Sequence, residues 1–124
     1  MLVKDLMKKP LVIEKDASLK KAAELMKKNN INSLIMVNGS KIKGLITRKD
    51  LTNNFGSNKK ISQTMLKRVI TVYDNDNVTK AIELIKNKNI GILPVVDKED
   101  NLVGVISTKD LLIYACEASD FLIE

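Results

Sequence analysis

The sequence predicts an α/β (α+β) fold in which two pseudo-symmetric copies of one β-α-β-β-α unit pack sheet to sheet. Three observations lead to this prediction: an internal repeat spans nearly the whole chain, each copy has one amphipathic helix, and each copy has two apolar strands. The 124 residues suit one compact domain or two closely packed halves. A unit of about sixty residues buries too little surface alone, so we expect the copies to bury it together.

The repeat is carried by segments that match at an offset of about sixty residues. The clearest pairs are Val3–Met7 with Ile61–Met65, Lys21–Lys27 with Lys80–Lys86, and Gly44–Leu51 with Gly104–Leu111. A polar stretch, Gly56–Lys60, is typical of a connector between copies. We therefore place the two repeats at residues 1–57 and 58–124.

Each copy contains one predicted amphipathic helix. Ser18 and Asn77 are good helix N-caps, and the apolar residues after each recur at helical spacing over about three turns. Each helix is expected to end in a polar run, at Asn29–Asn30 in the first copy and Lys88–Asn89 in the second.

Two predicted strands follow each of these helices. The strands are the apolar runs Leu34–Val37, Ile42–Ile46, Leu93–Val96 and Leu102–Ile106. The pair Asn38-Gly39 is a hairpin signal in the first copy, and residues 97–101 form a longer turn in the second. Because the runs are continuously apolar, we expect both faces to be buried, with a short second helix after each pair.

The composition excludes several classes of function. With no histidine, the chain cannot use Ser-His-Asp or Cys-His catalysis and lacks the ligand of nearly all zinc sites. The single cysteine, Cys116, fits a reducing compartment. No apolar run reaches the roughly 18 residues of a membrane span, and the first residues lack the apolar core of a signal peptide. We expect a cytoplasmic protein that is neither an enzyme nor bound to a membrane.

The net charge of +6 is uneven, because the excess of Lys and Arg lies in residues 1–62. A basic half can attract an anionic ligand or nucleic acid, although a solvated lysine-rich surface explains it more simply. Few aromatics, scattered lysines and the lack of a recognition motif speak against nucleic acid, which stays an alternative function. A structural dimerisation module with empty clefts is the other alternative.

The closing motif of each copy has the form Gly-h-h-Ser/Thr-x-x-Asp, where h is apolar. It occurs as Gly44–Asp50 and as Gly104–Asp110, and Asp5–Met7 and Leu93–Asp97 add two further motifs. Taken in this order and spacing, they resemble the CBS-domain family, named for cystathionine β-synthase, over residues 3–116. The sequence is identified as a tandem CBS pair in stand-alone form.

The resemblance implies a regulatory module that senses AMP, ADP, ATP or S-adenosylmethionine in two clefts between the copies, without a further cofactor. The motif Asp would contact the ribose hydroxyls, nearby Ser, Thr and basic residues the phosphates, and the loops of the other copy the adenine. The first cleft is expected to hold Thr47, Arg48, Asp50, Val69, Ile70, Thr71, Ile90, Gly91, Ile92, Leu93 and Pro94. The second is expected to hold Ser107, Thr108, Asp110, Pro10, Leu11, Val12, Ile31, Asn32, Ser33 and Leu34.

Physical chemistry gives the motif two compatible roles. An ionised Asp accepts hydrogen bonds from both ribose hydroxyls, and a helix start favours phosphate. The pairs Thr47 with Asp50 and Ser107 with Asp110 also have the form of a helix capping box, which needs no ligand. The first copy departs from the family pattern, because Ile35 stands where the second copy has Pro94.

The two clefts are expected to differ in charge. Arg48, with Lys67 and Arg68 near it, would surround Asp50, whereas Lys8 and Lys9 would face Asp110. Because arginine binds phosphate through a planar fork, we expect the Asp50 cleft to prefer ligands with more phosphates.

Apolar residues near the end of the chain predict a homodimer, because large exposed apolar patches mark interfaces. These residues are Leu111, Leu112, Ile113, Phe121, Leu122 and Ile123. The family resemblance implies association through the second helices. The expected target of the regulation is a separate protein or the module's own oligomer, and the sequence does not identify which process is controlled.

Overall fold

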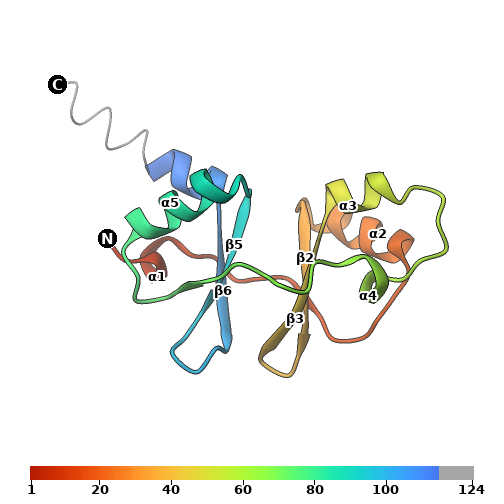
Figure 1. Ribbon diagram of the computed structural model, residues 1–124, viewed down its shortest axis with the longest axis horizontal. Helices are drawn as coiled ribbons and strands as arrows, with labels where there is room; N and C mark the ends of the chain where they lie inside the picture. The colour runs from red at the N-terminus through yellow and green to blue at the C-terminus, as the bar shows by residue number, and fades with distance from the viewer. Residues whose placement is uncertain (115–124) are drawn as a thin grey trace. The chain divides into compact units, whose positions relative to one another are not determined.

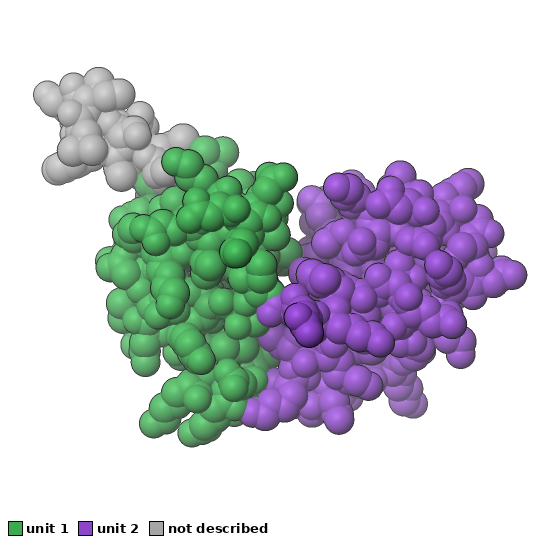
Figure 2. Space-filling model, viewed as in Figure 1, with its two compact units in different colours: residues 1–10, 70–124 green, residues 11–69 purple. Residues whose placement is uncertain are grey.

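The structure is a computed structural model that describes residues 1–114. The chain forms two compact units, which are coloured separately in Figure 2. Unit 1 joins residues 1–10 to the described residues from Ile70 onward, and unit 2 consists of residues 11–69. Each sequence repeat therefore has a leading segment, residues 1–10 in the first and 58–69 in the second, that folds with the remainder of the other repeat. The predicted packing of the copies sheet to sheet stays a prediction.

Unit 2 is a three-stranded mixed sheet with helices (Figure 1). Its elements are β1 (Val12–Ile13), α2 (Leu19–Asn29), β2 (Ser33–Asn38), β3 (Lys41–Thr47), α3 (Arg48–Asn53) and α4 (Ile61–Thr64). The central strand β2 pairs in parallel with β1 and antiparallel with β3. The β2–β3 turn lies one residue further along than predicted, because Asn38 still pairs with Lys41.

Unit 1 repeats this arrangement. Its elements are α1 (Val3–Leu6), β4 (Val72–Tyr73), α5 (Val78–Lys88), β5 (Ile92–Val96), β6 (Leu102–Ser107) and a helix described over residues 108–114. Strand β5 is central, parallel to β4 and antiparallel to β6. The predicted β-α-β-β-α unit is thus confirmed in both copies, and the short helices α1 and α4 are additions that the sequence did not predict.

Both long helices begin and end where the sequence predicts. The Ser18 hydroxyl accepts a hydrogen bond from a backbone N–H in the first turn of α2, and the Asn77 side chain does the same for α5. Each helix ends at an asparagine in the left-handed conformation, Asn30 with φ 53° and Asn89 with φ 52°. Asparagine tolerates this conformation better than most residues, which explains why the polar runs stop the helices.

The central strands form the core of each unit. Leu34–Val37 in β2 and Leu93–Val96 in β5 are buried throughout, as predicted. The outer strands β3 and β6 are buried only in part, and Lys41 and Lys43 of β3 are exposed. The prediction of burial on both faces therefore holds for the central strands and is wrong for the start of the outer ones, which lie at the sheet edge.

The exchanged leading segments attach to these outer strands. Lys8 and Val105 exchange two backbone hydrogen bonds of 2.8 and 2.9 Å, and Leu66 and Leu45 do the same at 2.8 and 2.9 Å. Each segment also packs a methionine against the motif glycine, so that a Cβ on Gly104 would lie 2.6 Å from the sulfur of Met7. The motif glycine therefore makes room for the segment that arrives from the other repeat.

Candidate functional site

Asp50 forms the predicted capping box at the start of α3. Its Oδ2 accepts hydrogen bonds from the backbone N–H of Thr47 at 2.8 Å and from the Thr47 hydroxyl at 3.0 Å. The Asp50 N–H in turn donates to the Thr47 Oγ1 at 3.3 Å. Within residues 1–114, no donor or cation reaches the other carboxylate oxygen, Oδ1. The box therefore orients the carboxylate and leaves one oxygen available.

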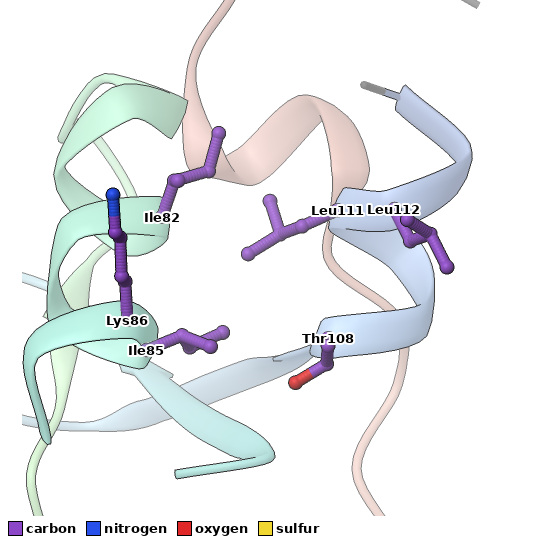
Figure 3. Close-up of a pocket in the computed structure, with 6 residues that line it drawn as sticks. All are labelled: Ile82, Ile85, Lys86, Thr108, Leu111 and Leu112. Carbon is purple, nitrogen blue, oxygen red and sulfur yellow. The ribbon is translucent and has the colours of Figure 1, made fainter. Parts of the chain in front are cut away.

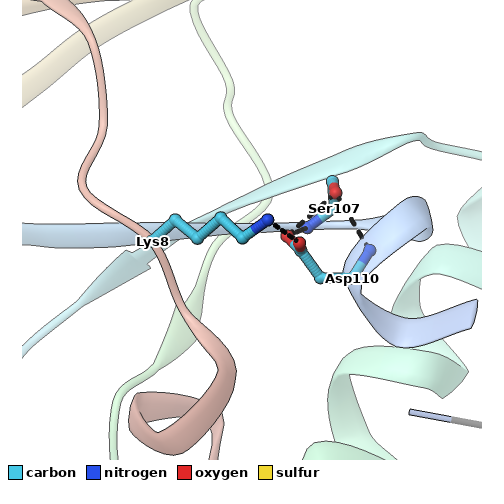
Figure 4. Close-up of polar contacts among 3 residues, drawn as sticks. All are labelled: Lys8, Ser107 and Asp110. Carbon is cyan, nitrogen blue, oxygen red and sulfur yellow. Dashed lines mark hydrogen bonds and ion pairs between the residues drawn. The ribbon is translucent and has the colours of Figure 1, made fainter. Parts of the chain in front are cut away.

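Asp110 forms the same box, but its second oxygen is occupied (Figure 4). Its Oδ2 accepts from the Ser107 N–H at 3.0 Å and from the Ser107 hydroxyl at 2.9 Å. Its Oδ1 lies 2.8 Å from Nζ of Lys8, on the leading segment of unit 1. The Asp110 side chain is 8% exposed and the Lys8 side chain 66%. The cation of a largely exposed side chain thus pairs with a buried carboxylate.

The electrostatics of Asp110 follow from these contacts. Burial by itself would raise the pKa of Asp110, but hydrogen bonds from Lys8 and from Ser107 outweigh it and hold the pKa below its ordinary value. The carboxylate is therefore ionised at neutral pH and acts only as a hydrogen-bond acceptor.

The loop before each central strand lies beside the motif of its own unit. The Arg48 N–H donates to the Asn32 carbonyl at 2.9 Å, and the Thr108 N–H donates to the Gly91 carbonyl at 3.0 Å. The Thr108 hydroxyl also donates to the Gly91 carbonyl, at 3.2 Å. The structure therefore joins predicted residues that the sequence assigned to different clefts. The grouping of each motif with loops of the other copy stays a prediction.

The predicted apolar residues divide into two groups by burial. The side chains of Leu34, Leu93 and Pro94 are buried in the core of their own units and offer a ligand no accessible surface. The other predicted loop residues are partly or well exposed; they are Pro10, Leu11, Val12, Ile31, Asn32, Ser33, Val69, Ile70, Thr71, Ile90, Gly91 and Ile92. These positions fit contacts with a flat heterocycle better than the buried three.

Among residues 1–114, no three His, Cys, Asp or Glu side chains gather in a way that would hold a metal ion. Over the same residues, every helix is too short or too polar to cross a bilayer.

Two mixed three-stranded sheets, each closing on a capped Gly-h-h-Ser/Thr-x-x-Asp motif, define a tandem-repeat module. The family model of the CBS domain matches the chain twice, at residues 3–57 and 59–117. The chain belongs to the CBS domain family.

Known proteins support this assignment. The chain is 34% identical over 113 residues to the L-aspartate semialdehyde sulfurtransferase of Methanocaldococcus jannaschii, covering 89% of this chain but 22% of that protein. It is 34% identical to a CBS domain-containing protein of Dictyostelium discoideum, over 90% of this chain and 88% of that one. Among solved structures, it resembles the CBS domain pair of protein MJ0100 in complex with 5′-methylthioadenosine and S-adenosyl-L-methionine. That likeness has 31% identity, a TM-score of 0.88, and covers 95% of this chain and 98% of the other.

Proposed function

We propose that the chain is a regulatory module that binds an adenosine-containing ligand through Asp50 and Asp110. The observation that carries this proposal is its likeness to the MJ0100 pair, which was solved with two adenosine compounds and matches over 95% of this chain. The side chains support it, because each motif Asp is held by two hydrogen bonds on one oxygen. A carboxylate fixed in this way is preorganised to accept ribose hydroxyls on the other oxygen.

The proposed sites are those implied by the family resemblance. Asp50 with Thr47 and Arg48 would serve one ligand, and Asp110 with Ser107 and Thr108 the other. Each would be completed by the loops assigned to it from the sequence. The basic residues near each Asp would meet a phosphate or carboxylate group where the ligand carries one.

The proposed role is regulatory, not enzymatic. The chain spans 22% of the sulfurtransferase that it matches, so the reaction named for that relative belongs to a much longer protein. Ligand binding would act by favouring one conformation of the module or its assembly, and thereby alter a protein target that is not identified. The cytoplasmic location predicted from the sequence is part of the same proposal.

We also propose that the module works as a homodimer. A groove of about 200 Å³ runs between α5 and the helix at residues 108–114, lined largely by apolar side chains (Figure 3). Leu112, on its rim, is 60% exposed, and the adjacent Ile113 is 50% exposed. Exposed aliphatic side chains beside an apolar groove favour a contact with a second copy. The predicted contributions of Phe121, Leu122 and Ile123 lie outside the described residues.

A thermal-shift panel tests the ligand proposal. AMP, ADP, ATP, S-adenosylmethionine and 5′-methylthioadenosine are each added to the folded protein. A ligand at a hundred times its Kd should stabilise the native state by about 2.7 kcal/mol. The double variant Asp50→Asn, Asp110→Asn is the control and should lose the shift. If none of these compounds stabilises the wild-type protein, the proposal is wrong and a module with empty sites is the better interpretation.

A further inference from the structure

The two motifs of this chain differ in one contact that the repeat itself does not predict. Lys8 is tied to β6 by its two backbone hydrogen bonds with Val105, and its Nζ lies on the Asp110 carboxylate. Leu66 holds the matching place in unit 2, through the same two bonds with Leu45. Leu66 carries no charge, and so, among residues 1–114, the Asp110 motif has a cation on its carboxylate and the Asp50 motif does not.

Because of this ion pair, a ligand at Asp110 competes with Lys8 for the carboxylate oxygen Oδ1. Ribose hydroxyls that donate to Asp50 find Oδ1 without a partner among the described residues. At Asp110 the same oxygen already accepts a charge-assisted hydrogen bond from Lys8. An uncharged adenosine compound must share or displace that bond and offers the ammonium group no negative charge in return.

A ligand with phosphate on its ribose avoids this loss. An ammonium group has three donors, so Lys8 can bridge the carboxylate and a phosphate oxygen, or turn from one to the other. The Lys8 side chain is free to do so, since it is 66% exposed while its backbone is held in place. The negatively charged phosphate then pairs with the Lys8 ammonium group while the ribose hydroxyls donate to the Asp110 carboxylate.

We infer that Lys8 is a specificity-determining residue of the Asp110 site, which selects phosphorylated adenosine ligands over uncharged ones. The inference rests on the proposed function and deepens it, because it names the ligand class of one of the two sites. The Asp50 site has Leu66 in the matching place, so a phosphate preference there would depend on Arg48 and not on a lysine held at the carboxylate. Because the Lys8 side chain is 66% exposed, solvent screens the ion pair, and the expected preference is modest, roughly threefold to tenfold in the ratio of dissociation constants.

The test compares AMP with adenosine by titration calorimetry. In Asp50→Asn protein, only the Asp110 site keeps its carboxylate. Adding Lys8→Leu, which copies the residue at position 66, should lower the preference for AMP by roughly threefold to tenfold. Adding Lys4→Leu is the matched control, because Lys4 is an exposed lysine of the same segment without an ion pair in the described part of the chain, and the ratio should stay unchanged. Higher salt should reduce the Lys8 effect.

The reciprocal variant tests the same idea at the other site. In Asp110→Asn protein, Leu66→Lys should raise the preference of the Asp50 site for AMP over adenosine. Circular dichroism checks that each variant is folded. The same ratio is also measurable from ligand-induced stabilisation of Lys8→Leu in the otherwise wild-type chain, so the test does not depend on Asp50→Asn folding.

The outcomes separate the two proposals. If neither compound binds the wild-type protein, the inference fails, and the proposed function fails with it only if none of the five panel compounds stabilises the protein. If both bind and Lys8→Leu leaves their ratio unchanged, the proposed function stands and Lys8 is only a structural ion pair. A purely structural role would weaken both ligands equally, whereas a selective role changes their ratio.

Discussion

Replacing Gly104 by alanine places a methyl group in space that Met7 occupies. The new Cβ would lie 2.6 Å from the Met7 sulfur, 2.9 Å from its Cγ and 3.1 Å from its Cβ. Carbon and sulfur atoms normally approach to roughly 3.5–4 Å, so Met7 must move. Turning its side chain relieves the first two contacts, but its Cβ follows the backbone that pairs Lys8 with Val105.

The size of the effect follows from two opposing terms. Overpacking of this kind costs about 1–3 kcal/mol, and the lower chain entropy of alanine in the unfolded state returns about 0.4–1 kcal/mol. We expect a net loss of about 1–2 kcal/mol for Gly104→Ala. Gly44→Ala should cost less, although its new Cβ would also clash with the Met65 side chain, because all three contacts are to Cγ, Sδ and Cε, which can rotate away.

Urea unfolding followed by circular dichroism measures these losses. Gly91→Ala is the control, since its nearest neighbour would be the Thr108 hydroxyl at 4.0 Å, and it should stay within about 0.5 kcal/mol of wild type. If Met7 is the obstacle, Gly104→Ala should cost less in a Met7→Ala background. A Gly104→Ala protein as stable as wild type, or strictly additive double variants, would refute the packing argument.

Four further predictions concern the motif aspartates and the dimer. Because the folded-state pKa of Asp110 is depressed, its contribution to stability is present at neutral pH and should be lost as the pH falls below about 4. The free energies of unfolding of wild type and Lys8→Leu, measured in urea, should therefore differ at neutral pH and converge in acid. Asp50→Ala and Asp110→Ala should each abolish one calorimetric site and cost about 0.5–2 kcal/mol of cap stability; a loss of stability with unchanged affinity would leave capping as the only role. Leu112→Glu should turn a dimer into a monomer in light scattering, and a wild-type monomer would contradict the proposed interface. Calorimetry on Asp110→Ala protein should show ATP bound more tightly than AMP at Asp50, where Arg48 adds a forked donor; equal affinities would contradict this.

The sequence predicted the features that arise from local signals. The N-caps at Ser18 and Asn77, the asparagine helix ends and both capping boxes depend on residues within one helical turn of each other, and all are confirmed. The helices α1 and α4 were missed because four residues are too few to show a helical period. The partners of Met7 and Met65 were missed for another reason, since no local pattern identifies which strand a distant segment will join.

The same exchange of segments decides how the two aspartates differ. Repeat symmetry aligns Lys8 with Leu66, and each residue lies in the leading segment of its own sequence repeat. Because these segments fold with the opposite repeat, the lysine of the first repeat acts on Asp110 of the second. The sequence predicted that Lys8 and Lys9 face Asp110, but only the structure puts the Lys8 Nζ on the carboxylate. A change in the first repeat therefore alters the aspartate of the second, which lets two nearly identical motifs in one chain acquire different ligand preferences.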